Sequence, residues 1–277
     1  MKHAVSGEYV VLTDISDFSL PAIFECGQCF RWNADENGVY YGIAFARALE
    51  IRREGEQVLL KTTERDFREI WYDYFDLDTD YAKIRRLVSI NGHMEAAADF
   101  GAGIRILRQE RWEALCSFII SQCNNIPRIK KIVETLCSLF GEEISPGKYA
   151  FPSAERVAAL TEAQLSPLRA GYRTKYILDA ALAVATGAVD LQLMAEMMPS
   201  DALKALKNMT GVGDKVASCV ALFGLHQLNA FPVDVWMKKA LATHFDNDFD
   251  PDVFSPYAGV AQQYIFNYER NGKKNGN

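Results

Sequence analysis

The pentapeptide GVGDK, from Gly211 to Lys215, constrains the fold of this chain more than any other stretch of its sequence. Apolar residues with helical spacing precede the two glycines, and a second such run follows them up to Phe223. Glycine has no Cβ, so Gly211 and Gly213 can adopt positive φ and let the backbone approach a ligand closely. The pattern therefore predicts a helix, a tight glycine hairpin and a second helix whose N-terminus favours an anion such as a phosphate.

A lysine and an aspartate stand at the starts of two successive predicted helices. Lys215, rather than a carboxylate, is expected in the first turn after the hairpin, where a cation is unfavourable. A lysine amine is a nucleophile only when it is neutral, and a positive helix end and burial both favour that form. Further along, Pro232 stops any helix, and Asp234 is a good N-cap for a helix over 235–244. The two side chains could therefore face one pocket.

The helix, the GVG hairpin, Lys215 and the Pro-Val-Asp loop ending at Asp234 together resemble the helix–hairpin–helix DNA glycosylases with a Gly/Pro-rich loop and an aspartate (HhH-GPD). The neighbouring sequence is most similar to their 8-oxoguanine DNA glycosylase/AP lyase branch, from Gly27 to about Phe266. The resemblance implies a bifunctional enzyme of base excision repair that flips 8-oxoguanine out of duplex DNA. Lys215 would attack C1′ of the sugar, and Asp234 would stabilise the positive charge developing there. β-Elimination from the resulting Schiff base would then nick the strand.

The resemblance also implies which residues form the pocket for the flipped base. The carbonyl of Gly27, in the segment GQCFRW, would accept the hydrogen on N7 of 8-oxoguanine, which guanine lacks. Cys219 and Phe266 would lie on the two faces of the purine, and Gln262 would hydrogen-bond its Watson–Crick edge. Gln262 and Phe266 are four residues apart and share a helix face, although a C-terminal core helix would show the same pattern.

A second set of residues matches those that read the partner base left behind in the duplex. These residues are Asn124, Asn125, Arg128, Tyr172 and Arg173. Amides and guanidinium groups hydrogen-bond base edges, and Arg128 corresponds to the family arginine that contacts the opposite cytosine. Helix capping would explain the two asparagines equally well, and a surface turn would explain Tyr172 and Arg173.

Two positions depart from the family pattern. Cys123 stands where many relatives have a third asparagine. A thiol is a weak hydrogen-bonding group, so the segment that fills the gap left by the flipped base would be less selective for the partner base. Trp236 stands where many relatives have a histidine that contacts DNA near the lesion, so phosphate contacts there would be rearranged. The hairpin backbone at Gly211 and Gly213 would hold phosphates without reading sequence.

Two other functions remain compatible with the motif. An alkylbase glycosylase shares the hairpin and the aspartate, but it needs neither Lys215 nor the segment around Gly27. A non-catalytic hairpin module that holds DNA or a protein would keep its function without Lys215 and Asp234.

The remaining sequence predicts an α+β fold with an N-terminal antiparallel sheet. Strand-like segments lie near 8–13, 39–45, 48–53 and 57–62. Helical spacing predominates from Asp66 onward. We expect a mixed β/α domain at 1–108, a helix–hairpin–helix glycosylase domain at 109–270 that carries catalysis, and a disordered tail at 271–277.

Composition sets further expectations. The chain has 277 residues and no apolar run that approaches ~20 residues, so we expect no membrane span and a cytoplasmic location, at the nucleoid in a bacterium. A net charge of −6 argues mildly against non-specific polyanion binding, but it allows a local basic patch. Cys26 and Cys29 form a lone CxxC, and the four histidines show no ligand spacing. We expect a monomer that needs no metal and no cofactor, and whose partner is double-stranded DNA containing an oxidised purine.

Overall fold

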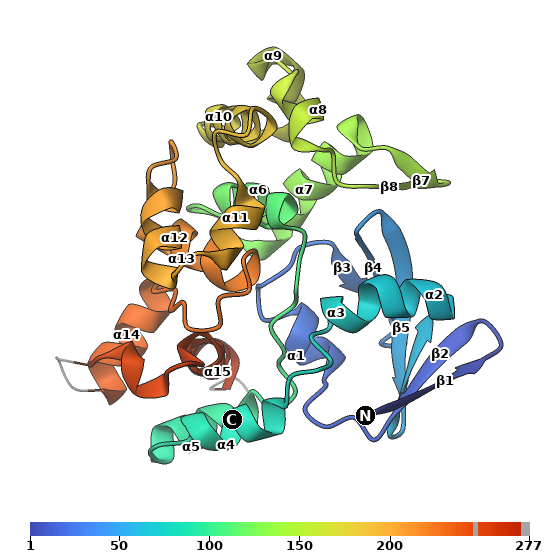
Figure 1. Cartoon of the computed structure of the whole chain (residues 1–277), viewed down its shortest axis with the longest axis vertical. Helices are drawn as coiled ribbons and strands as arrows, with labels where there is room; N and C mark the ends of the chain where they lie inside the picture. The colour runs from blue at the N-terminus through green and yellow to red at the C-terminus, as the bar shows by residue number, and fades with distance from the viewer. Residues whose placement is uncertain (246–248, 273–277) are drawn as a thin grey trace.

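One six-stranded antiparallel sheet organises the N-terminal part of the molecule and lies beside the helical part (Figure 1). The computed structural model describes residues 1–245 and 249–272. The strands follow the order β1-β2-β6-β5-β4-β3. Their bounds are β1 Lys2–Ser6, β2 Tyr9–Thr13, β3 Trp32–Ala34, β4 Tyr40–Ala44, β5 Arg47–Glu54 and β6 Gln57–Lys61. The predicted α+β class with an antiparallel sheet is confirmed.

The inner face of the sheet follows the alternation of apolar residues. Val10 and Leu12 of β2 are fully buried and pair across the ladder with Leu60 and Val58 of β6. Successive side chains on a strand point to opposite faces, so this period of two determines which face meets the core.

Trp32 closes the sheet core and requires a glycine on the neighbouring strand. Its ring stacks on Phe24 with centroids 4.1 Å apart. A Cβ on Gly42 would lie 2.2 Å from the Trp32 ring, so only glycine fits opposite it. Phe30, in contrast, packs against Phe118 in the helical core, with ring centroids 5.7 Å apart. The chain between these two aromatic residues therefore crosses from the sheet core to the helical core.

Most of the remaining chain is helical. The helices are α1 Leu20–Phe24, α2 Glu64–Asp66, α3 Tyr72–Tyr74, α4 Tyr81–Val88, α5 Gly92–Phe100, α6 Arg111–Ile120, α7 Ile126–Phe140, α8 Ala154–Ala158, α9 Glu162–Leu165, α10 Arg173–Ala185, α11 Leu191–Glu196, α12 Pro199–Lys207, α13 Asp214–Phe223, α14 Val235–His244 and α15 Ala258–Asn271. A π-helical turn at Phe67–Trp71 joins α2 to α3, and 3₁₀ turns lie at Ser166–Leu168 and Pro251–Phe254. A small hairpin pairs β7 Glu143–Ser145 with β8 Lys148–Tyr149.

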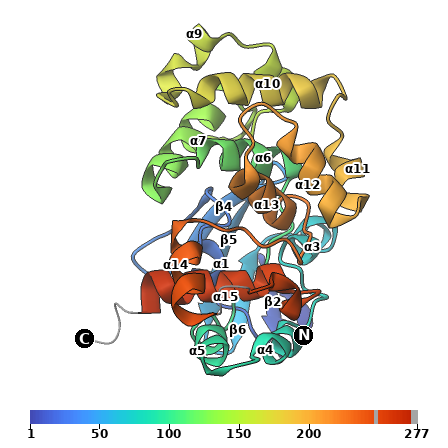
Figure 2. The ribbon, with the colours of Figure 1, turned by 90° about the vertical axis from the view of Figure 1, so that its left-hand side faces the viewer.

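Helix α15 lies at the centre of the helical part. Figure 2 shows it crossing the molecule between α13 and the α4–α5 pair, and it packs against α4, α5 and α14. Helices α4 and α5 precede residue 108, yet their buried residues belong to the same core as those of the later helices. The two parts of the chain are therefore interlocked, and the boundary at 108/109 stays a prediction.

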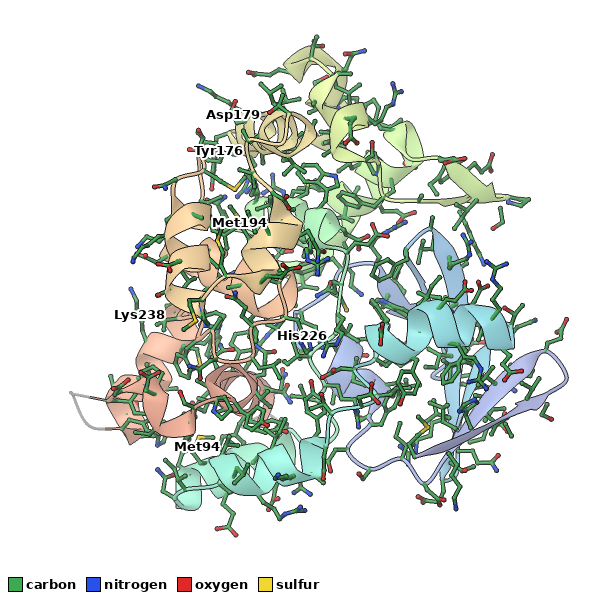
Figure 3. The ribbon with its side chains drawn as sticks, in the orientation of Figure 1. Met94, Tyr176, Asp179, Met194, His226 and Lys238 are labelled. Atoms are coloured by element: carbon green, nitrogen blue, oxygen red, sulfur yellow. The ribbon has the colours of Figure 1, made fainter. Side chains whose placement is uncertain are left out.

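A buried aspartate joins the sheet part to the helical part. Asp76 accepts hydrogen bonds from the hydroxyl of Tyr81 at 2.9 Å and from Nε of Arg108 at 2.9 Å. His226 Nε2 lies 3.4 Å from the same carboxylate, at the junction seen in Figure 3. Burial raises the pKa of Asp76, but His226 and Arg108 together hold it below its usual value. The ionised carboxylate therefore fastens the two parts together at neutral pH.

Several short strands and helices were not predicted from the sequence, among them β1, β3 and α5. Strand β1 is almost entirely exposed, so it carries no apolar alternation that would reveal it. Strand β3 has only three residues, and helix α5 lies in a stretch that sequence reasoning left unassigned. Edge elements of this kind are set by their pairing partners more than by their own pattern.

The C-terminal helix extends into the segment expected to be a disordered tail. Helix α15 ends at Asn271, while residues 273–277 lie outside the described residues. In the described part of the chain, no helix has the length and apolar character needed to cross a bilayer.

Candidate active site

The predicted helix–hairpin–helix is formed by α12 and α13, and its two glycines differ in conformation. Gly211 has φ +78, in the left-handed region. Gly213 is the N-cap of α13 with φ −91 and extended backbone, so of the two glycines that could adopt positive φ only Gly211 does so. A Cβ on Gly211 would lie 2.3 Å from the ring of Tyr176, a residue of α10 labelled in Figure 3.

This difference gives a matched pair of substitutions. We expect Gly211→Ala to lower the free energy of unfolding by roughly 2–5 kcal/mol, because it adds left-handed strain and a clash with Tyr176. Gly213→Ala should cost less than about 1 kcal/mol, because no atom lies within 4 Å of its Cβ and only the N-cap preference is lost. Urea unfolding of both variants measures the difference. Equal losses would contradict the assignment of the turn to Gly211.

Lys215 lies in the first turn of α13, but Asp214 begins the helix. The expectation of a lysine without a carboxylate in this turn is therefore wrong, and Asp214 forms an ion pair with Lys207 at 2.6 Å. Lys215 is half-buried, and its Nζ donates to Oγ of Ser121 at 3.4 Å. The same nitrogen lies 5.6 Å from the centre of the Phe118 ring. Phe118 on α6 and Ser121 at the C-terminal end of that helix thus hold the amine in place.

Asp234 caps α14, which confirms the predicted N-cap and the helix over 235–244. Its Oδ1 accepts a hydrogen bond from the backbone N–H of Met237 at 2.9 Å. A capping bond of this kind fixes the carboxylate, because the side chain and the first helical turn hold each other.

Lys215 and Asp234 line one cavity of about 330 Å³. Of the other predicted residues, Gly27, Phe266 and the two asparagines share this lining. Trp236 also lines it and is 45% exposed, so its ring is available to contact a large ligand. Aromatic rings together with amide and charged side chains line this cavity, which suits a small, flat and polar molecule.

Two predicted pocket residues lie outside the cavity lining. Among the residues that the structure describes, Gln262 and Cys219 are buried and take no part in that lining. The Oε1 of Gln262 accepts a hydrogen bond from Gln263 at 2.8 Å. Burial raises the pKa of the Cys219 thiol despite the opposing effect of Lys215, so the thiol is protonated at neutral pH. Direct contact of either side chain with a base stays a prediction.

Gln28 fixes the backbone next to Gly27. Its Nε2 donates to the carbonyls of Ile23 at 2.9 Å and Arg105 at 2.8 Å, and its Oε1 accepts from Leu107 N–H at 2.9 Å. The side chain is fully buried, so these bonds are not exchanged with water. Gly27 itself lies at the cavity with φ +89. The hydrogen bonds of Gln28 hold the backbone at this position rigid.

The residues predicted to read the partner base gather beside the cavity, around the turn between α6 and α7. Asn125 caps α7, with its Oδ1 accepting from the N–H of Arg128 at 3.0 Å. The Arg128 side chain is exposed, and it donates to the carbonyl of Arg169 at 3.0 Å. Asn124 donates from its amide to the carbonyl of Ile120 at 3.1 Å. The capping interpretation of Asn125 is thus realised, and its contact with DNA stays a prediction.

Tyr172 and Arg173 differ in their surroundings. Tyr172 is 53% exposed, whereas Arg173 is 4% exposed and donates to the carbonyls of Ala170, Gln122 and Cys123. Arg173 therefore holds the turn that carries the asparagines, and contact with a base would require it to give up these bonds. Cys123 has φ +45, a conformation that asparagine tolerates better than cysteine.

Sequence reasoning missed several residues of this site. Phe118 and Ser121 surround the Lys215 amine, and Gln28 anchors Gly27. Arg270 lines the cavity and lies over the Phe266 ring, 5.8 Å from its centre. Arg270 follows Phe266 by four residues, so a continued helical spacing would have indicated it. The other three are brought in by tertiary packing.

Both parts of the chain match known protein families. Residues 10–115 match the 8-oxoguanine DNA glycosylase, N-terminal domain, and residues 116–252 match the HhH-GPD superfamily base excision DNA repair protein. The N-glycosylase/DNA lyase of Saccharomyces cerevisiae is 31% identical over 253 residues, which cover 81% of this chain and 67% of the yeast protein.

Solved structures agree with the sequence relatives. The structure of MBOgg1 with a low-affinity DNA ligand superposes with a TM-score of 0.92 at 40% identity, over 99% of this chain and 100% of that one. The Clostridium acetobutylicum 8-oxoguanine glycosylase/lyase, in complex with double-stranded DNA containing cytosine opposite 8-oxoguanine, gives a TM-score of 0.92 at 36% identity, over 99% of each chain. This chain is thus a helix–hairpin–helix base-excision protein by fold and site. It belongs to the 8-oxoguanine DNA glycosylase/AP lyase family.

Proposed function

We propose that this protein removes 8-oxoguanine from duplex DNA and then cleaves the strand at the site of the lost base. The observation that carries the proposal is the single cavity lined by Lys215, Asp234, Phe266 and Gly27. A nucleophilic amine, a rigid carboxylate, an aromatic ring and a fixed backbone segment are the groups that excision of a flat purine requires.

The chemistry follows from the placement of these groups. The neutral Lys215 amine attacks C1′ while the N-glycosidic bond breaks, and the bonding electrons leave with the base, which takes up a proton. Asp234 stabilises the positive charge that develops on the sugar. Loss of a proton from nitrogen and opening of the sugar ring give a Schiff base. Removal of a proton from C2′ then expels the 3′ phosphate and nicks the strand.

The substrate class is tested with three duplexes that differ in one base. They carry 8-oxoguanine, guanine or 7-methylguanine opposite cytosine, and base release and strand cleavage are measured separately. We expect release and cleavage from the 8-oxoguanine duplex only. Release of 7-methylguanine without cleavage would instead assign the protein to the alkylbase glycosylases, which use the aspartate and water.

We propose that Arg128 gives the enzyme a preference for cytosine opposite the lesion. Its exposed guanidinium beside Asn124 can contact a base edge, and one such contact is worth about 1–3 kcal/mol of discrimination. Arg128→Ala should reduce the ratio of excision opposite cytosine to excision opposite adenine by roughly 5- to 150-fold. Lys131→Ala, an exposed cation on the same helix, should leave the ratio unchanged. Equal excision by the wild type opposite all four bases would refute the preference.

We infer that the protein acts as a monomer on DNA in the cytoplasm. Lys215, Asp234 and Phe266, to which the proposal assigns the chemistry and the stacking, already meet in the cavity of one chain, so the proposed reaction needs no residue from a second copy. Light scattering at working concentration tests this, and a stable dimer would contradict it.

A further inference from the structure

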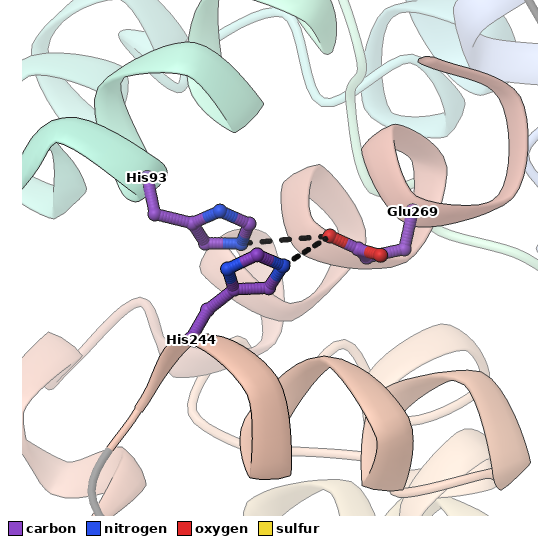
Figure 4. Close-up of side chains that lie close together, drawn as sticks. All are labelled: His93, His244 and Glu269. Carbon is purple, nitrogen blue, oxygen red and sulfur yellow. Dashed lines mark ion pairs between the residues drawn. The ribbon is translucent and has the colours of Figure 1, made fainter. Parts of the chain in front are cut away.

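Three potential metal ligands from three helices meet at the end of α14 farthest from Asp234. His93 is the second residue of α5, His244 is the last residue of α14, and Glu269 lies near the end of α15 (Figure 4). The Oε1 of Glu269 lies 3.2 Å from Nε2 of His244 and 3.9 Å from Nε2 of His93. The three ligand atoms all lie within 4.8 Å of one another.

The surroundings of the cluster orient both imidazoles toward the carboxylate. The two rings are stacked, with centroids 3.9 Å apart and an interplanar angle of 12°. Phe245 and Tyr268 pack edge-on against His93, each with centroids 5.7 Å from it. Figure 4 shows both Nε2 atoms facing Glu269. The site is therefore walled by aromatic rings on one side.

The cluster is also accessible from solvent. The side chain of Glu269 is 6% exposed and that of His93 is 15% exposed, but that of His244 is 29% exposed. An ion can therefore enter past His244, while the carboxylate that supplies the negative charge stays buried.

We propose that His93, His244 and Glu269 bind a divalent transition-metal ion, with Zn²⁺ as the best fit. Zinc takes nitrogen ligands at about 2.0–2.1 Å and carboxylate oxygen at about 2.0–2.2 Å, so two ligands of a tetrahedral ion lie roughly 3.3 Å apart. The His244–Glu269 distance already matches this value, and the His93–Glu269 distance needs to close by about half an ångström. The two rings are nearly parallel, so one imidazole also has to turn before both Nε2 lone pairs meet at the ion. Imidazole with one carboxylate suits zinc better than calcium or magnesium, and water would take the fourth position.

The ion would act on the fold and not on the base, even though three protein ligands and a water differ from the four protein ligands of most structural zinc sites. None of its three ligands lines the cavity that holds Lys215, so it would take no part in base removal. It would instead tie the end of α14, which begins at Asp234, to α15, which carries Phe266 one turn before Glu269. Metal binding would thus stabilise α14 and α15, the two helices whose residues Asp234 and Phe266 line the cavity. The inference does not rest on the proposed substrate, so either can fail alone.

The test measures Zn²⁺ binding to metal-stripped full-length protein by calorimetry and thermal unfolding. The background carries Cys123→Ser, because Cys123 is the one exposed thiol among the described cysteines and would bind zinc itself. We expect one Zn²⁺ per chain and a higher Tm with zinc. Loss of an indirect partner already weakens metal sites 10- to 100-fold, so His244→Ala should weaken binding by at least about 100-fold and abolish the Tm shift.

Two further variants keep the test decisive. Glu269→Gln preserves side-chain shape and should also lose the zinc-dependent shift, even if one of the histidine variants folds poorly. His3 lies on strand β1 and its ring packs against Phe67 of the π-helical turn, so His3→Ala should bind zinc like the background. The proposal is overturned if the background binds no zinc, or if His244→Ala and Glu269→Gln bind it as well as the background does. Either result would leave a histidine–carboxylate hydrogen bond as the role of the cluster.

Discussion

Replacing Lys215 with glutamine should slow excision of 8-oxoguanine by at least about 1,000-fold. Glutamine has nearly the length of lysine but no nucleophilic amine, so no covalent bond to C1′ can form. The side chain sits between Ser121 and Phe118 at the cavity wall, and an amide can keep the contact with the Ser121 hydroxyl. The fold and DNA binding should therefore survive, and single-turnover kinetics at saturating enzyme measure the chemical step alone.

A lysine on the first helix of the same helix–hairpin–helix motif provides the control for Lys215. Lys204 lies on α12, is largely exposed and pairs with Asp201 at 3.2 Å. Lys204→Gln removes one positive charge close to the hairpin but none from the cavity, so the single-turnover rate should stay within about twofold of wild type. A Lys215→Gln variant that excises the base at the rate of Lys204→Gln would show that water, not Lys215, attacks the sugar.

Asp234→Asn should reduce the excision rate by about 100- to 1,000-fold while leaving stability unchanged. Asparagine is as good an N-cap as aspartate, so the bond to the N–H of Met237 is kept. What is lost is the negative charge that stabilises the sugar cation. The measurement is single-turnover excision together with urea unfolding of the same preparation.

Asp234→Ala separates the two roles of this side chain. It removes both charge and cap, so it should match the kinetic loss of Asp234→Asn and in addition cost about 0.5–2 kcal/mol of unfolding free energy. If Asp234→Asn retained full activity and only Asp234→Ala lost it, the aspartate would be a cap without a role in chemistry.

The parts of this fold that local sequence determines were predictable. The helix after Asp234 begins and ends at the predicted residues, because a side-chain cap and a preceding proline act within a few positions. Strands β2, β4, β5 and β6 were also predicted, since short strand-like runs separated by turn-rich segments mark them. That Lys215 and Asp234 line a common cavity was predicted from two motifs, each of which places its residue at the start of a helix.

What depends on distant parts of the chain was not predictable. Arg173 sits in a motif that suggests an exposed contact, but its guanidinium is buried against carbonyls of residues 122 and 123. His93 and His244 show no ligand spacing, and only the packing of α5 and α14 on α15 brings both to Glu269. At Gly213 the motif allowed positive φ, and the N-cap geometry of α13 selects extended backbone instead.

The measurement that tests the central claim most directly is borohydride trapping on a duplex with one 8-oxoguanine opposite cytosine. Reduction converts the Schiff base into a stable bond between the protein and the DNA. We predict a covalent complex whose peptide map places the DNA on Lys215, and no such complex with Lys215→Gln. Release of the base by wild type without a trapped complex, or a bond mapped to another lysine, would contradict the assignment of Lys215 as the nucleophile.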